Sequence, residues 1–300
     1  MSETLASLHR KIEGAGDLES VVRTMKAVAA SGISQYERAV ESLDDYYHTV
    51  EMGLVAAFQK TGKPIAASIG RRDKVPPIHA VVFGSDQGLV GQFNDVLADF
   101  VIKTLSPLPG EKVIWAVGER IRGRLDDVGV KTEGLLQVPN SVSAITPLVG
   151  QILLECETQG KVEEMYSMYL FHNRPKSGAI YEQASQTLLP LDEAWLGKNK
   201  EIPWPTNNLP EVIGESDVTV KALISEYLFV SLFKACAESL ASENASRLAA
   251  MQRAEKNIDE LLEDLSRTFH HLRQGSIDEE LFDIVSGFEA LKNGRGISHE

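Results

Sequence analysis

The stretch IDELLEDLSRTFHHL, residues 258–272, places an apolar side chain at every third or fourth position. This is the spacing that a left-handed coiled coil buries. The stretch YERAVESLDDYYHTVEMGL, residues 36–54, has the same spacing, and in the back segment the pattern resumes after a one-residue skip near Gly275. The apolar positions are Val22, Met25, Ala29, Gly32, Tyr36, Val40, Leu43, Tyr47, Val50 and Leu54 in front, and Ile258, Leu262, Leu265, Phe269, Leu272, Ile277, Leu281, Ile284, Phe288 and Leu291 behind. The two ends of the chain are therefore predicted to pair as an antiparallel coiled coil.

The distribution of proline supports two long helices. All 12 prolines lie between Pro64 and Pro210, and a helix interior excludes proline because the ring removes a backbone donor and clashes with the preceding turn. The pattern predicts helices over roughly residues 3–58 and 218–293, the longer one projecting beyond its partner. Ordinary amphipathic helices on a globular core are the alternative, but such helices seldom exceed about 25 residues.

The middle of the chain alternates between strand and helix signals. Strands are predicted at 78–84, 112–118 and 164–173, helices at 91–105, 119–129 and 141–160, and a last, antiparallel strand at 179–191. Such alternation predicts a small, mostly parallel, Rossmann-like α/β sheet with right-handed crossovers. The expected domains are a coiled-coil helix (1–63), the α/β domain (75–195), a linker rich in Pro, Asn and Gly (196–217) and the second coiled-coil helix (218–293).

Composition excludes several functional classes. The net charge is −13, and residues 211–300 hold 9 Lys and Arg against 17 Asp and Glu, so −8 of it lies there. A nucleic-acid partner is disfavoured because phosphate binding needs a basic stripe. The sequence has no apolar run of about 18 residues and no signal-peptide pattern, so neither a membrane span nor export is expected. The two cysteines form no metal-ligand pattern.

The stretch GSDQGLVG, residues 84–91, is the one segment that suggests a ligand site. A glycine-rich turn between a strand and a helix can hold phosphate at the helix N-terminus. Its spacing, however, matches neither the dinucleotide-binding fingerprint nor the P-loop. We interpret Gly84, Asp86, Gly88 and Gly91 as a structural turn and expect no catalytic residue, cofactor or metal; a nucleotide site remains the alternative.

Three segments resemble F-type ATP synthase gamma subunits. MKAVAAS, residues 25–31, is similar to the MKxVAAS stretch of their first helix, and SDQGLVG, residues 85–91, to their SDRGLCG turn. ESLASENASRLAAM, residues 238–251, continued by QGSI (274–277) and ELFDIVSG (280–287), resembles their ExLASExxxRxxAM and QxxIxxEIxxIVxG patterns. The order and spacing agree from about residue 3 to 292.

The resemblance implies both fold and function. Gamma subunits combine an antiparallel coiled coil with a Rossmann-like domain, and they are the rotor shaft within a ring of three alpha and three beta subunits. Their α/β domain, with the epsilon subunit, contacts the membrane c ring. The chain is thus expected to be a non-catalytic, peripheral subunit on the cytoplasmic face of the membrane. It would couple proton or sodium flow to ATP synthesis on beta.

The resemblance also implies contact residues. Met25 and Arg247 match positions where the family's shaft meets the beta subunit, and Arg23 and Lys26 are their neighbours on the first helix. Arg247 and the nearby Gln252 are expected to make polar contacts with beta, while a core methionine of the coiled coil is the alternative role for Met25. The apolar side chains Ile284, Phe288 and Leu291 are expected to turn within a smooth sleeve. Arg247→Ala is expected to weaken coupling while the coiled coil stays folded.

The sequence departs from the family at several positions. Gly32 stands where lysine is usual, Gln87 where the turn has arginine, and Val90 where it has cysteine. These departures favour a divergent branch, of which the alternative ATPase copies of some bacteria and archaea are an example. Two rival functions remain: a coiled-coil adaptor unrelated to ATPases, and a nucleotide-binding enzyme built on the central sheet.

Overall fold

A computed structural model describes residues 4–61, 76–159, 166–199 and 216–294, together with residues 204, 206, 208, 210 and 211. The chain divides into two compact units. The first unit contains Met1–Ala27 and Met251–Glu300, and the second contains Val28–Ala250. Each long helix contributes to both units.

The two predicted long helices are confirmed. Helix α1 spans Leu5–Thr61 (57 residues), and helix α7 spans Ser216–Gly294 (79 residues). In α1 the buried side chains recur every seven residues, as the heptads require. These residues are Leu8, Ala15, Val22, Ala29 and Tyr36, followed two heptads later by Val50.

In the first unit, α1 and α7 run antiparallel. Lys26 Nζ donates to Glu255 Oε2 over 2.5 Å, and the rings of His9 and Phe269 lie 6.3 Å apart. As the residue number falls in α1 it rises in α7, which defines the antiparallel pairing. The heptad positions Ile258, Leu262, Leu265 and Phe269 are half-buried, so the seam predicted at residues 258–269 is formed.

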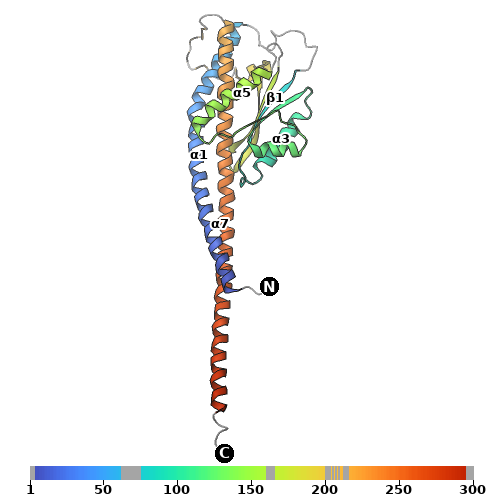
Figure 1. The fold of residues 1–300 in the computed structure, drawn as a ribbon. Coiled ribbons are helices and arrows are strands. Elements are labelled where there is room, and N and C mark those ends of the chain that lie inside the picture. The colour runs from blue at the N-terminus through green and yellow to red at the C-terminus, as the bar shows by residue number, and fades with distance from the viewer. Residues whose placement is uncertain are drawn as a thin grey trace, which may run out of the picture. The chain divides into compact units, whose positions relative to one another are not determined.

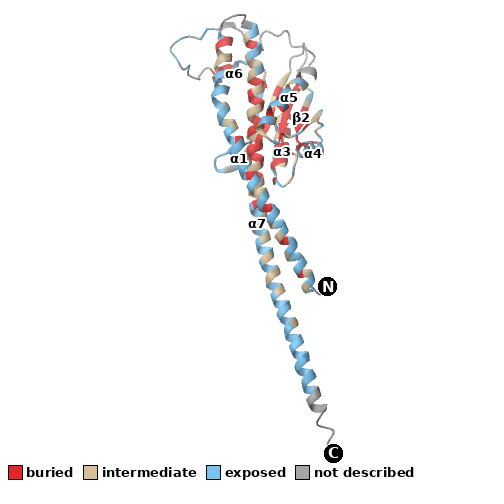
Figure 2. Ribbon diagram, turned by 60° about the vertical axis from the view of Figure 1, so that its left-hand side comes forward, coloured by how far each residue is buried: buried red, intermediate tan, exposed pale blue. Residues whose placement is uncertain are grey.

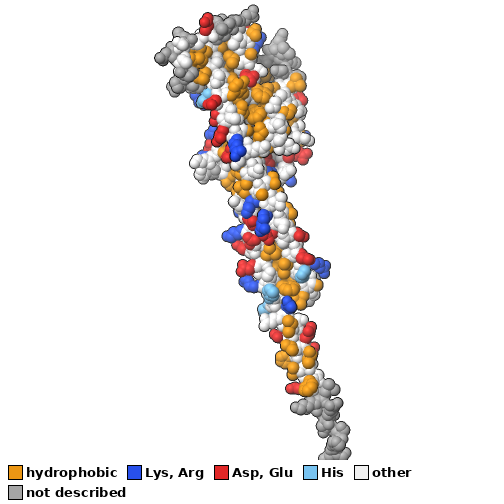
Figure 3. Space-filling view, turned by 90° about the vertical axis from the view of Figure 1, so that its left-hand side faces the viewer, with side chains coloured by type: hydrophobic (Ala, Val, Ile, Leu, Met, Phe, Trp, Pro, Cys, Tyr) orange, Lys and Arg blue, Asp and Glu red, His pale blue; other side chains and the backbone are white. Residues whose placement is uncertain are grey.

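The heptads of α7 beyond residue 272 have no partner among the described residues. Their apolar side chains are exposed, with Phe282 at 76% and Phe288 at 71%. Figure 3 shows hydrophobic side chains gathered along this end of α7, next to the residues drawn in grey. The group consists of Ile277, Leu281, Phe282, Ile284, Val285 and Phe288. The apolar pattern therefore extends past the paired part of α7, and only its first part is covered.

The second unit contains a five-stranded sheet in the order β3-β2-β1-β4-β5. Its strands are β1 (Ile78–Phe83), β2 (Lys112–Val117), β3 (Gly134–Leu136), β4 (Ser167–Lys176) and β5 (Ala179–Leu189). Pairs β1–β2, β1–β4 and β2–β3 are parallel, and β4–β5 is antiparallel. The predicted mostly parallel sheet with an antiparallel last strand is confirmed (Figure 1).

Helices cover both faces of this sheet. One face packs against α3 (Phe93–Leu105) and α4 (Glu119–Asp127). The other packs against α5 (Ile145–Gln159) and the second-unit parts of α1 and α7. Successive side chains of β1 point to opposite faces of the sheet. Val82 packs on the face covered by α3 and α4, and Val81 packs on the face covered by α5, α1 and α7. All of β1 is therefore buried, as Figure 2 shows for the strands and the neighbouring part of α7.

Three local features differ from the sequence predictions. Strand β3 was not predicted, because three residues are too few to show a period. The predicted helix 141–160 begins as a 3₁₀ turn, η1 (Val142–Ala144), before α5. The predicted linker starts inside α6 (Glu193–Asn199), where Trp195 Nε1 donates to Tyr227 Oη over 3.2 Å. Much of the remaining linker lies outside the described residues.

Candidate functional site: the turn after β1 and the motif of α7

The turn from Gly84 to Gly91 leaves β1 and leads into α3, and its first glycine has no room for a side chain. The Gly84 N–H donates to the Val117 carbonyl of β2 over 2.9 Å. A Cβ built at Gly84 would lie 2.3 Å from Ile121 Cβ of α4 and 2.8 Å from Asn94 Oδ1 of α3. The close approach of these two helices to the strand end therefore requires glycine.

Asp86 connects this turn to two other segments. One of its carboxylate oxygens accepts from the Glu119 N–H at the start of α4, and the other accepts from the Val138 N–H, each over 2.9 Å. A carboxylate at a helix N-terminus is also favoured by the helix dipole. Both oxygens are thus used within the chain, and their negative charge opposes a phosphate at this turn.

Ser85 and Asn94 close the turn onto α3. Asn94 Oδ1 accepts from the Ser85 N–H over 3.1 Å, and Asn94 Nδ2 donates to Ser85 Oγ over 2.8 Å. The middle of the turn is different, because Leu89 is 61% exposed and has a φ of 62°. A left-handed backbone is costly for a bulky residue. The contacts around the turn hold it in this conformation.

The ESLASENASRLAAM motif of α7 is used to hold the α/β fold. Ser239 Oγ donates to the Phe83 carbonyl at the end of β1 over 3.1 Å, and Ser246 Oγ donates to the Val90 carbonyl of the turn over 2.6 Å. Glu238 Oε2 lies 2.7 Å from His172 Nε2 of β4. Three polar side chains, two of them adjacent and the third about two turns further along the helix, therefore join α7 to the sheet and the turn.

Arg247 and Glu243 form a nearly buried ion pair within the same motif. Arg247 Nη2 donates to Glu243 Oε1 over 2.5 Å, and the two side chains are only 12% and 7% exposed. Burial raises the pKa of the Glu243 carboxyl, and the Arg247 guanidinium partly opposes that shift. Arg247 Nε is buried without a hydrogen-bond partner in the structure as described. Arg247 is therefore largely buried, and its one described hydrogen bond is made within its own helix.

The other predicted contact residues occupy different environments in the first unit. Arg23 is exposed and pairs with Glu19. Lys26 pairs with Glu255, Met25 is half-buried, and Gln252 is exposed. The structure thus pairs Lys26 and Arg247 within the chain and leaves Arg23 and Gln252 at the surface. Contact with a beta subunit stays a prediction for all five residues.

The predicted sleeve residues lie on the exposed end of α7. Ile284 is 69% exposed and Phe288 is 71% exposed. Leu291 belongs to the same helix, but its side chain lies outside the described residues. The first two side chains are therefore free to contact another protein.

Sequence reasoning missed the residues that join α7 to the α/β fold. Ser239 and Ser246 bond to backbone carbonyls more than a hundred residues away, and no local pattern indicates such partners. Their spacing of seven residues on one helix face was the available signal.

Within the described ranges, no group of three or more His, Cys, Asp or Glu side chains is arranged to hold a metal ion. In the same part of the chain, none of the helices combines the length and the hydropathy that crossing a bilayer requires.

Curated relatives and solved structures resemble this chain along most of its length. The ATP synthase gamma chain of Bdellovibrio bacteriovorus is 25% identical over 296 residues, covering 96% of this chain and 99% of that one. The gamma chain of Syntrophobacter fumaroxidans is 27% identical over 300 residues, with 96% and 99% covered.

Solved structures agree in fold. A chain of the Euglena gracilis mitochondrial ATP synthase (OSCP/F1/c-ring) has a TM-score of 0.66 at 17% identity, covering 99% of this chain and 97% of that one. A chain of the Tetrahymena thermophila central stalk and c-ring has a TM-score of 0.58 at 22% identity, covering 78% and 99%. The family model described as ATP synthase matches residues 4–291. The chain therefore belongs to the ATP synthase family, and its relatives are gamma chains.

Proposed function

We propose that this chain is the central rotor shaft of an F-type ATP synthase. It turns inside three alpha and three beta subunits and, with an epsilon subunit, contacts a membrane c ring. Ion flow through that ring turns the shaft, and the shaft changes the nucleotide affinity of successive beta subunits. Catalysis lies on beta, and this chain supplies the mechanical coupling. The complex lies at the cytoplasmic face of the membrane, with this chain as a peripheral subunit.

The observation that carries this proposal is the attachment of α7 to the α/β fold. A shaft driven at its α/β domain must pass torque from that domain to the helix. Ser239, Ser246 and Glu238 provide three polar bonds between them, and the apolar core on the same face of the sheet adds packing. Hydrogen bonds are directional, so they resist sliding of the helix along the sheet.

The unpartnered apolar end of α7 supports the second part of the proposal. A row of exposed aliphatic and aromatic side chains on a helix commonly marks a binding surface for another protein. Ile284, Phe288 and Leu291 would lie in the sleeve formed by the alpha and beta subunits. The proposed contacts with beta are made by Arg23, Met25, Lys26, Arg247 and Gln252. The proposed domains are the first coiled-coil helix (1–63), the α/β domain (75–195), the linker (196–217) and the second coiled-coil helix (218–293).

A double substitution at the exposed end of α7 tests the sleeve. Ile284→Asp with Phe288→Asp is expected to lower ATP-driven ion pumping at least about tenfold, because burying two charges in an apolar sleeve is costly. The isolated variant should keep its helical circular dichroism, since neither side chain is packed within the chain. Pumping is measured in vesicles that carry the assembled complex.

The matched control is Asp283→Asn with Glu289→Gln, which changes two exposed side chains of the same helix segment without adding charge. The control should pump at the parent rate. Equal pumping by the aspartate variant and this control would contradict the sleeve. Failure of the parent chain to assemble with the alpha and beta subunits encoded beside it would contradict the rotor itself.

A further inference from the structure

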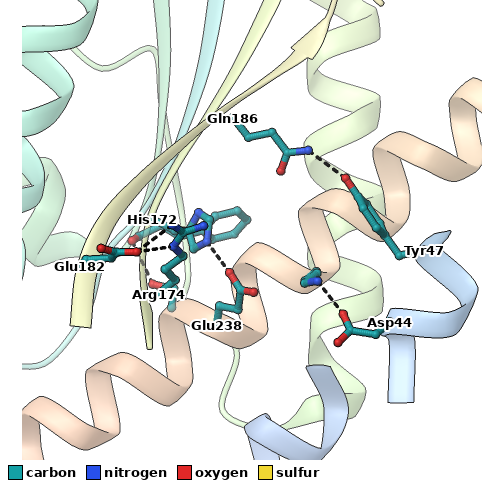
Figure 4. A network of polar contacts seen from close by, with 10 residues as sticks. Asp44, Tyr47, His172, Arg174, Glu182, Gln186 and Glu238 are labelled. Atoms are coloured by element: carbon teal, nitrogen blue, oxygen red, sulfur yellow. Dashed lines mark hydrogen bonds and ion pairs between the residues drawn. The ribbon is translucent and has the colours of Figure 1, made fainter. Parts of the chain in front are cut away.

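A polar groove in the second unit lies between the sheet and the long helices, apart from the turn and the motif contacts of Ser239 and Ser246. It has a volume of about 520 Å³ and is formed by residues of α1, β4, β5, α6 and α7. Figure 4 shows part of its wall, with His172 and Arg174 from the sheet facing Glu238 of α7. Pockets of this volume hold small organic ligands in many proteins.

The carboxylates of the groove already have partners. Glu238 Oε2 lies 2.7 Å from His172 Nε2, and Glu51 Oε2 lies 3.3 Å from His48 Nδ1. His172 is only 6% exposed. An imidazole nitrogen beside each carboxylate engages one of its two oxygens. Each carboxylate of the groove thus has one oxygen engaged within the chain.

Three cationic side chains of the groove keep unused N–H groups. Lys198, at the end of α6, has no acceptor among the described residues, and it is exposed. Arg174 donates through Nε and Nη2 to a single oxygen of Glu182, over 2.9 and 2.7 Å, and its Nη1 carries no described bond. Lys234 Nζ pairs with Asp44 over 2.6 Å and retains further N–H groups. These donors come from three different elements and line one groove.

We propose that this groove binds a small molecule that carries phosphate oxygens, held by Lys198 and Arg174. Guanidinium and ammonium groups together are the usual protein ligands of phosphate. The volume exceeds what one inorganic phosphate needs, so both free phosphate and a phosphate ester fit. A ligand there would bridge α6 and the sheet and stabilise the second unit. The site is independent of the rotor assignment, because it needs this chain alone.

The test measures binding to the purified full chain. Sodium phosphate and sodium ADP are titrated separately by calorimetry, with sodium chloride at equal ionic strength as the reference. Phosphate or ADP is expected to bind and to raise the unfolding temperature above the chloride reference. Tighter binding of ADP than of phosphate assigns the site to a phosphate ester, and equal or weaker binding assigns it to free phosphate.

Substitutions locate the site. Lys198→Gln and Arg174→Gln are each expected to raise the dissociation constant of the bound phosphate or ADP at least about tenfold, because each removes a charged hydrogen bond. Lys176→Gln is the matched control. Lys176 lies in β4 like Arg174 and also pairs with Glu182, but it does not line the groove. The proposal is overturned if neither phosphate nor ADP gives a binding heat or a rise in unfolding temperature beyond that of sodium chloride. Equal affinities in Lys198→Gln, Arg174→Gln and the control would also overturn it.

Discussion

Gly84→Ala is expected to lower the free energy of unfolding of the chain by about 3 kcal/mol, near the upper end of the overpacking range. The new Cβ would lie 2.3 Å from Ile121 Cβ and 2.5 Å from Ile121 Cγ2. Relief requires a shift of α4 away from β1, and that shift would also strain the Asp86 bond to the Glu119 N–H. Urea unfolding followed by tryptophan fluorescence measures the loss.

Gly123→Ala is the matched control for this prediction. Gly123 lies in α4 itself, and a Cβ added there meets nothing within 4 Å. Alanine in an exposed helix interior is expected to stabilise the chain by up to about 1 kcal/mol. A Gly84→Ala chain within about 0.5 kcal/mol of the parent would show that the helices around the turn can move at little cost.

Arg247→Ala is expected to lower the free energy of unfolding by about 3 kcal/mol at neutral pH, because it leaves the buried Glu243 without its cation. The raised pKa of Glu243 gives this loss a pH dependence. A carboxyl whose folded pKa lies above its unfolded value near 4.5 favours the folded state when protonated, and that advantage is lost as the pH rises through the folded pKa. The deficit should therefore be largest above the folded pKa of Glu243 and shrink as the pH falls through it.

The paired variant Arg247→Met with Glu243→Gln is the control. It removes both charges, and replacing a whole buried ion pair is often close to neutral. Urea midpoints at several pH values measure both variants. A pH-independent loss in Arg247→Ala would contradict the role of the buried carboxyl. The paired variant, which leaves no unpaired charge buried, can then test contact with beta alongside Arg247→Ala.

The long helices could be predicted because the sequence signals that specify them lie within each helix itself. Apolar residues at heptad spacing and the absence of proline specify a helix and the face that it buries. Strand β1 was also predictable, since it is buried on both faces and reads as a continuous apolar run. Strand β3, with three residues, and helix α6, with seven, depend on tertiary contacts instead.

The polar contacts of the site could not be predicted for a different reason. Asp86 was recognised as part of a turn, but its partners at Glu119 and Val138 follow from the order of the strands. Ser239 and Ser246 bond to carbonyls, which carry no sequence signal. The partner of Arg247 lies one helical turn away in the same motif, so the spacing alone could have suggested the Glu243 pair.

Single-molecule rotation tests the central claim most directly. The chain carrying Gly123→Cys is assembled with alpha and beta subunits freed of accessible cysteine, and a bead is attached to the new thiol, since Cys156 and Cys236 are buried. With the beta subunits fixed to glass, ATP is expected to drive rotation in one direction, in steps of about 120° as a ring of three equivalent pairs requires. A bead that only fluctuates while the complex hydrolyses ATP would contradict the rotor function.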